Sequence, residues 1–291
     1  MGVRSTLSRK VAIVTDSTAY FEPGEAEKLG IHVIPLTIQL GHDRFSEGIN
    51  IDSDELFRRL NYGAPYPASL PPDPAVFEEL YSKLHKQTDQ MLSIHISSHL
   101  SKTLQQARMG AESLLGRCSI ELVDSMTTSV GLGILVKAAA RAANEGASLD
   151  DIVRLVRGMI PHIYLVFYVE TMDYLERSGR IGKAQAILGS MLNIKPILFM
   201  EDGDIIPLEK VRTTEKAIEK LFEFVAEFDN LEQTAIIQPH KQPDKEARTL
   251  QERLEQSFPN LRFPIIQYGP DLATRVGPNA MGIVVYEGMT F

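Results

Sequence analysis

The sequence predicts an α/β protein with two domains. We expect an N-terminal three-layer α/β sheet domain over residues 1–160 and a C-terminal α+β domain with a mixed or antiparallel sheet over residues 161–291. Apolar strands alternate with amphipathic helices in the first half, whereas a hairpin precedes a strand–helix–strand pattern in the second. The length of 291 residues also fits two domains of about 150 residues each.

The alternation in the first half is typical of a mostly parallel sheet with helices on both faces. Apolar, β-branched runs predict strands at residues 11–15, 31–39, 92–96 and 120–124. Helical spacing and capping residues predict helices at residues 25–29, 53–60, 74–86, 103–115, 129–144 and 149–160. Pro35 favours an edge position or a bulge for the second strand. Five prolines between residues 63 and 74 predict a stiff loop.

The second half contains a hairpin with Asp202-Gly203 as its tight turn. Its strands are predicted at residues 164–169, 194–200, 205–210, 234–239, 262–268 and 282–286. Its helices are predicted at residues 171–178, 184–192, 213–228 and 244–258. This order indicates a mixed or antiparallel sheet covered by helices.

Polar clusters follow three strands of the first half. They are Asp16-Ser17-Thr18, Ser97-Ser98 and Asp124-Ser125. The carboxyl ends of parallel strands meet at one edge of a sheet, so we expect the clusters to converge at the switch point, where such folds bind ligands. The helix that follows Ser97-Ser98 would add unpaired N–H groups suited to a carboxylate or phosphate. A simpler reading is that Ser98 or Ser101 only caps that helix.

Composition and absent motifs disfavour several functions. A net charge of -8 disfavours nonspecific nucleic-acid binding. A single cysteine, Cys118, allows neither an internal disulfide nor a multi-cysteine metal site. The histidines show no metal spacing, and His95 is expected to be a core residue. There is no phosphate loop or serine nucleophile elbow. We find no signal-peptide pattern and no apolar run near the roughly 20 residues of a membrane span, and expect a cytoplasmic protein.

Four stretches together resemble the DegV family of bacterial fatty-acid-binding proteins. They are Val11–Thr18, Ile96–Ala107, Leu175–Ile181 with Leu192–Ile197, and Thr274–Gly282. The resemblance implies a carrier without turnover of its own, metal or cofactor. It would hold one long-chain fatty acid, with the carboxylate on polar loops of the first domain and the tail in an apolar tunnel of the second. Some members present that carboxylate to a separate fatty acid kinase.

The resemblance also implies roles for individual residues. Ser97 and Ser98 match the carboxylate ligands, and Ser69 lies in the second ligand loop. Arg180 matches a motif near the place where phosphate forms. The remaining candidate ligands are Ser17, Thr274 and Arg275.

Two departures from the family pattern affect this expected site. Ala68 replaces a usual threonine, and Arg275 replaces a usual histidine. The guanidinium of Arg275 could still neutralise phosphate.

Two other classes of function stay open at the level of sequence. The polar strand ends would also suit a small-molecule phosphotransferase, although no nucleotide loop is present. Asp16 and Asp124 could then form an acid–base pair, or serve only as turn residues. The departures at Ala68 and Arg275 would also fit an interaction module that has lost its ligand.

Overall fold

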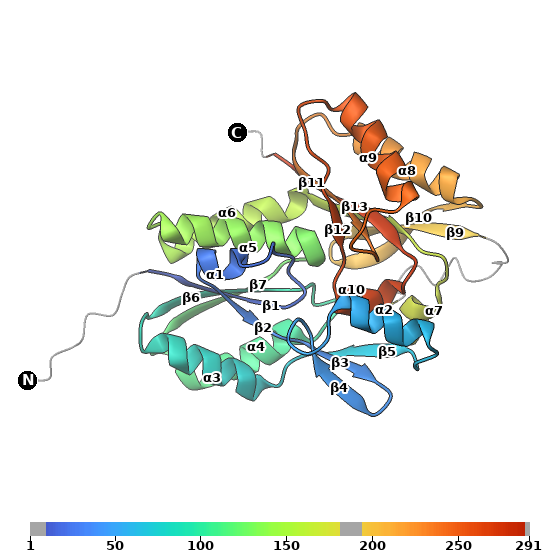
Figure 1. Ribbon diagram of the computed structural model, residues 1–291. Coiled ribbons are helices and arrows are strands. Elements are labelled where there is room, and N and C mark those ends of the chain that lie inside the picture. Colours follow the sequence, from blue (N-terminus) through green and yellow to red (C-terminus); the bar gives the residue numbers. More distant parts are fainter. Residues whose placement is uncertain (1–9, 181–193, 289–291) are drawn as a thin grey trace, which may run out of the picture.

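The computed structural model describes residues 10–180 and 194–288. Its N-terminal half surrounds one sheet and its C-terminal half surrounds another (Figure 1). The helix predicted at residues 184–192 lies outside the described residues. Within the described ranges, no helix has both the length and the apolar composition needed to cross a membrane.

The first sheet has four parallel strands in the order β2-β1-β6-β7. The strands are β1 (Ala12–Asp16), β2 (Ile31–Ile34), β6 (Gln90–His95) and β7 (Ser119–Asp124). Because β2 lies on one side of β1 and β6 on the other, the switch point falls between β1 and β6. The predicted parallel sheet is confirmed.

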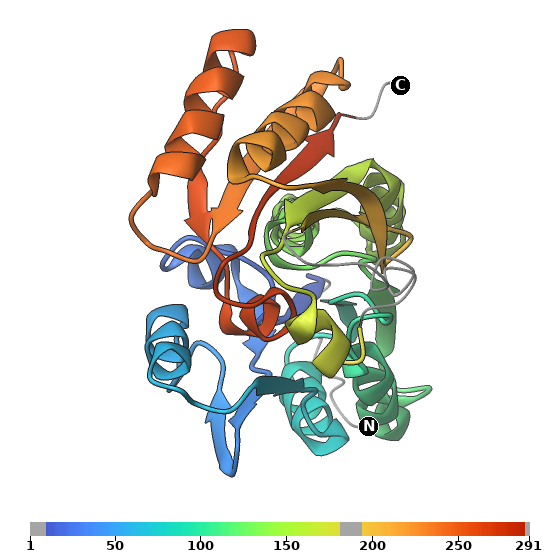
Figure 2. The same ribbon diagram turned by 90° about the vertical axis from the view of Figure 1, so that its right-hand side faces the viewer.

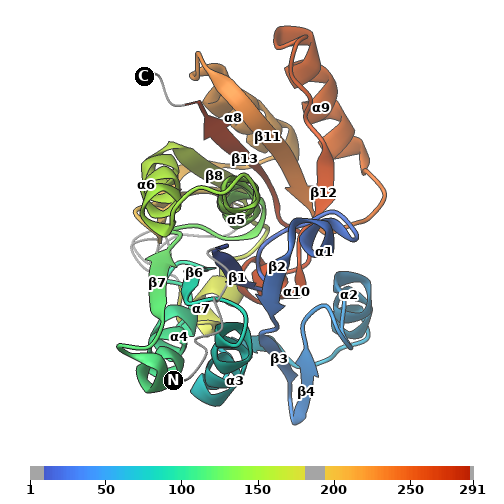
Figure 3. The same ribbon diagram turned by 90° about the vertical axis from the view of Figure 1, so that its left-hand side faces the viewer.

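Helices cover both faces of this sheet, which gives the predicted three layers (Figure 3). On one face lie α1 (Glu25–Leu29), α5 (Ser129–Asn144) and α6 (Leu149–Met159), and on the other α3 (Pro74–His85) and α4 (Thr103–Ala111). Asp73 and Ser148 cap α3 and α6 through their side chains. The helix expected to reach residue 115 ends at Ala111 and continues as a 3-10 turn.

The second sheet has six strands in the order β10-β9-β8-β13-β11-β12. Only the β11–β12 pair is parallel, so the predicted mixed sheet is confirmed. Its strands are β8 (Ile163–Tyr168), β9 (Lys195–Glu201), β10 (Asp204–Val211), β11 (Leu231–Gln238), β12 (Ile265–Gln267) and β13 (Met281–Glu287). Helices α8 (Thr214–Ala226) and α9 (Lys245–Ser257) cover one face, while α5 contacts β8 and β13 on the other.

The two sheets share α5, and one hydrophobic cluster runs from α5 into the second sheet. This cluster includes Val130 and Ile134 of α5 together with Leu165 and Val284. The chain passes from one sheet to the other between α6 and β8. The division into separate domains at residues 160 and 161 stays a prediction.

A third, smaller sheet corrects two expectations. The strand predicted at residues 31–39 breaks at Pro35 into β2 and β3 (Thr37–Leu40), which belong to different sheets. The loop predicted at residues 63–74 contains β5 (Pro67–Leu70). This strand pairs with β3, which also pairs with β4 (Asp43–Ser46). Pro67 is tolerated because it begins an edge strand, where its missing N–H costs little.

Three short helices surround this small sheet. They are α2 (Ser53–Asn61), α7 (Asp173–Arg177) and α10 (Pro270–Val276). The sequence analysis did not predict α10, although Pro270 stands at a favoured first position for a helix. Figure 2 shows α10 between the six-stranded sheet and the three-stranded sheet. It contacts β5, α2 and α7, and therefore joins the parts of the molecule that carry the predicted site residues.

Candidate functional site

The three polar strand ends converge as predicted. Asp16, at the end of β1, accepts hydrogen bonds through Oδ2 from the Ile96 backbone N–H at 3.0 Å, and it lies 2.9 Å from His95 Nδ1. Asp124, at the end of β7, accepts from the Ser98 N–H at 3.1 Å. Both carboxylates thus position the turn after β6, and the structure uses them as turn residues rather than as a facing acid–base pair. His95 is fully buried, as expected of a core histidine.

Ser97 is fully buried at this convergence. Its Oγ donates a hydrogen bond to the Gly203 carbonyl oxygen at 2.8 Å and accepts from the His99 N–H at 3.2 Å. Ser98 is exposed, and its backbone N–H is held by Asp124. Neither serine occupies the N-cap of α4, where Lys102 stands. The capping interpretation is therefore wrong for Ser98, whereas Ser101 Oγ accepts a hydrogen bond from the Thr103 N–H, the first N–H of α4, at 3.3 Å.

Ser69 provides a buried hydroxyl without a partner. It lies on β5, which packs against α10, and its Oγ has no hydrogen bond to any residue in the described part of the chain. Leaving such a group unsatisfied costs about 1–3 kcal/mol. Ser69 Oγ is therefore free to donate to the oxygen of a ligand.

Arg275 is held by the protein itself. Its Nε and Nη2 donate to the two carboxylate oxygens of Asp271 at 3.0 and 2.7 Å, and its Nη1 donates to the Leu100 carbonyl at 2.7 Å. The side chains of Arg275 and Asp271 are both buried. The structure thus places Arg275 in an ion pair that ties α10 to the turn after Ser97, and its expected role in neutralising a phosphate stays a prediction. Thr274 Oγ1 likewise bonds within α10, to the Asp271 carbonyl.

Arg180 is the more available of the two guanidinium groups. Burial lowers the pKa of Arg180, repulsion from Arg275 lowers it further, and Asp271 opposes both. Arg180 therefore lies near the Arg275–Asp271 pair. Among residues 10–180 and 194–288, its side chain has no hydrogen-bonding partner, so its charge can act on a bound anion.

Glu47 is a buried carboxyl group that the sequence did not single out. Its Oε1 accepts from the Asp271 N–H at 2.7 Å, and its Oε2 lies 2.5 Å from Ser17 Oγ. Burial raises the pKa of Glu47 to about 8, the charges of Asp271 and Asp16 raise it as well, and the bond to Ser17 opposes them. Glu47 therefore joins Ser17 to the first turn of α10. No local periodicity marks it, because its burial arises from tertiary contacts.

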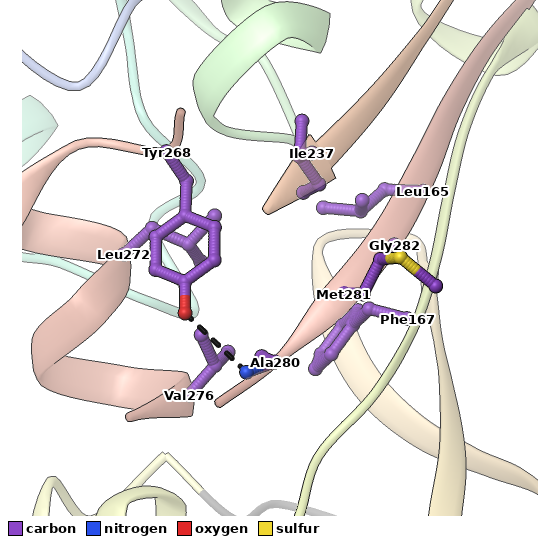
Figure 4. Close-up of a pocket in the computed structure, with 9 residues that line it drawn as sticks. All are labelled: Leu165, Phe167, Ile237, Tyr268, Leu272, Val276, Ala280, Met281 and Gly282. Carbon is purple, nitrogen blue, oxygen red and sulfur yellow. Dashed lines mark hydrogen bonds between the residues drawn. The ribbon is translucent and has the colours of Figure 1, made fainter. Parts of the chain in front are cut away.

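An apolar cavity lies on another side of α10 (Figure 4). It has a volume of about 10 Å³, and its lining residues are Leu165, Phe167, Ile237, Tyr268, Leu272, Val276, Ala280, Met281 and Gly282. The one hydroxyl among them, that of Tyr268, donates to the Gly277 carbonyl at 2.7 Å. The cavity walls thus offer no free polar group in this part of the structure. α10 lines the cavity with Leu272 and Val276 and carries the polar Asp271 and Arg275 alongside them.

The comparisons with known proteins agree with this architecture. Residues 10–288 match the model of a family described as "uncharacterised protein, DegV family". A DegV domain-containing protein of Streptomyces coelicolor is 37% identical over 281 residues, covering 96% of this chain and 99% of the relative.

Two solved structures have the same fold. DegV of Bacillus subtilis, described as a fatty acid binding protein, is 30% identical with a TM-score of 0.85 and coverage of 96% of this chain and 100% of that one. A Thermus thermophilus DegV family protein, described for its fatty acid binding, is 28% identical with a TM-score of 0.86 and the same coverage. The resemblance seen in the sequence is therefore confirmed, and the chain belongs to the DegV family.

Proposed function

We propose that this protein is a cytoplasmic carrier that binds one long-chain fatty acid. The observation that carries the proposal is the unpartnered Ser69 hydroxyl on a strand packed against α10, because α10 also lines the apolar cavity. A carboxylate at Ser69 would remove the cost of a buried, unsatisfied donor. The exposed Ser98 would supply a further donor at the turn after β6, and Ser97 would supply another once its bond to the Gly203 carbonyl is released. The descriptions of the B. subtilis and T. thermophilus relatives support the same ligand class.

The apolar tail supplies most of the affinity in this proposal. Burying a sixteen-carbon chain contributes roughly 12 kcal/mol at about 0.8 kcal/mol per methylene, before the cost of association. Each charge-assisted hydrogen bond adds about 1.5–3 kcal/mol. The cavity of about 10 Å³ is far smaller than ordinary ligand pockets, which span roughly 300–1,000 Å³. Entry of a long tail therefore requires flexible lining side chains such as Met281 to move.

Denaturing mass spectrometry of the protein purified from cells tests the proposal. We expect a co-purifying fatty acid, and stoichiometric uptake of palmitate or oleate after delipidation. A protein that carries no lipid and takes up neither acid would contradict the carrier function. Replacing both Ser97 and Ser98 by alanine should weaken retention. Unchanged retention would show that the carboxylate lies elsewhere.

The proposed partner is a separate ATP-dependent fatty acid kinase, to which the protein presents the carboxylate. Arg180 supports this role, because its charge beside the buried ion pair would attract a phosphorylated head group. We expect Arg180→Ala to retain fatty acid but to slow acyl-phosphate formation by a kinase that accepts the wild-type carrier. ATP consumption by the isolated chain would instead favour the phosphotransferase alternative.

A further inference from the structure

The turn between β9 and β10 closes over Ser97. Asp202 and Gly203 have φ values of 49° and 83°, so two consecutive residues adopt the left-handed conformation of a tight hairpin turn. The Gly203 carbonyl accepts the hydrogen bond of Ser97 Oγ at 2.8 Å, across 106 positions of sequence. The tip of a hairpin from the second sheet thus occupies the polar end of the first sheet.

A second contact fastens the same tip. Asp204 Oδ1 lies 3.0 Å from His99 Nδ1, two residues beyond Ser97. The fit around Gly203 is tight, since a Cβ there would lie 2.5 Å from Ser97 Oγ and 3.0 Å from Met126 Sδ. Glycine is therefore required both by the positive φ and by the close approach.

The base of the hairpin is anchored, whereas its tip extends beyond the neighbouring strand. β9 pairs with β8 only from Ile197 to Phe199. Met200 and Ile205 are buried in the main hydrophobic cluster and fix the position of the base. The residues between them reach past the β8 pairing and contact Ser97 and His99. A local change of the turn could therefore release Ser97 without unfolding the sheet.

We propose that this turn is a self-inhibiting lid, in which the Gly203 carbonyl takes the acceptor position that a fatty acid carboxylate would take on Ser97. The inference rests on the proposed function. A serine hydroxyl has one hydrogen to donate, so Gly203 and the carboxylate compete for it. Ser97 is also fully buried while the tip is in place. The apparent dissociation constant is the intrinsic value divided by the fraction of molecules whose tip is withdrawn.

Gly203→Ala tests the lid by weakening its closed state. Its matched control is Gly146→Ala, because Gly146 has a similar φ of 88° and a Cβ there would have open space within 4 Å. The probe is cis-parinaric acid, a fluorescent long-chain fatty acid. We expect Gly203→Ala to bind the probe several-fold more tightly and faster than Gly146→Ala. Equal affinities and rates in two folded variants would overturn the lid.

A variant in which the tip of the hairpin is cross-linked to the turn after Ser97 tests the lid independently if Gly203→Ala does not fold. His99→Cys and Asp204→Cys, in a Cys118→Ser background, place two thiols at the second contact of the tip. We expect the oxidised, cross-linked protein to take up the probe at least about tenfold more slowly than the reduced form of the same protein. Identical rates with and without the cross-link would overturn the lid. Failure of both the wild-type protein and a folded Gly203→Ala variant to bind any probe would instead overturn the proposed function itself, and the lid with it.

Discussion

At the scale of single residues, Ser69 combines an energetic cost with a proposed function. Its Oγ is buried without a partner in the described structure, so Ser69→Ala removes an unsatisfied donor. We expect the ligand-free variant to gain about 1 kcal/mol in unfolding free energy, while fatty acid binding weakens by about tenfold or more because one hydrogen bond to the carboxylate is lost. Urea unfolding and probe titration measure the two effects. The exposed Ser113→Ala should change neither.

A variant that becomes more stable but binds equally well would separate the two roles of Ser69. The hydroxyl would then be an unsatisfied group without contact to the ligand. A loss of both stability and binding would show that Ser69 has a structural partner.

The raised pKa of Glu47 predicts that the stability of the protein depends on pH. Its pKa in the folded protein is raised to about 8 from an ordinary value of 4.5, so the folded state keeps a proton that the unfolded state loses. The stabilisation associated with this proton is complete below about pH 4.5 and is lost as the pH rises towards 8. We expect the free energy of unfolding to fall between pH 5 and pH 9 more steeply in the wild type than in Glu47→Gln, which stays neutral.

Comparing the two proteins cancels the titration of all other groups, including His32, whose pKa burial lowers. Urea unfolding at a series of pH values provides the measurement. The exposed Glu79→Gln serves as the control and should keep the wild-type slope. Equal slopes in wild type and Glu47→Gln would mean that Glu47 ionises normally in the folded protein.

At the scale of secondary-structure elements, α10 depends on the buried pair of Asp271 and Arg275. Arg275→Met leaves the Asp271 carboxylate without its partner in the interior, which should cost about 3–5 kcal/mol of stability. The double variant Asp271→Asn with Arg275→Met removes both charges and should lose clearly less than the sum of the single losses. Urea unfolding of the four proteins in this cycle checks the prediction. Additive losses would show that the two side chains do not interact.

The sequence predicted most elements, because long strands and helices have a clear periodicity. The failures concern short elements whose partners are distant in sequence. β5 has four residues between prolines and becomes a strand only by pairing with β3. The residues around Pro35 read as one strand, since periodicity cannot show that β2 and β3 join different sheets. The pair Asp271 and Arg275 has the spacing of a helical ion pair, and with Pro270 it could have revealed α10.

The candidate site was predictable to a similar degree. The polar strand ends converge because parallel strands place their carboxyl ends together, which the alternation of elements already implied. The contact between Ser97 and Gly203 was not predictable, because it joins two sheets across 106 positions. The burial of Glu47 and of Arg275 depends likewise on how α10 sits between the sheets.

At the scale of the whole molecule, α10 links a polar region to an apolar one. The polar region is built mainly from the first sheet and the small sheet, whereas β8, β11 and β13 of the second sheet form much of the cavity wall. A ligand with a charged head and a long apolar tail would therefore contact both halves of the chain. Such a ligand should stabilise the molecule as one unit, since binding to the folded state alone raises its unfolding free energy.

A series of ligands separates the head group from the tail. Octanoate has the carboxylate of palmitate but eight fewer methylenes, so it should lose up to about 6 kcal/mol of binding free energy at about 0.8 kcal/mol per methylene. We expect its affinity to be lower by at least about a hundredfold, because some of that difference is offset by less ordering of the shorter tail. Methyl palmitate keeps the tail without the charge, and should bind more weakly than palmitate by about tenfold or more. Competition against cis-parinaric acid below micelle-forming concentrations measures all three. Equal binding of octanoate and palmitate would show that the tail does not enter the cavity beside α10, and the head group alone would then account for recognition.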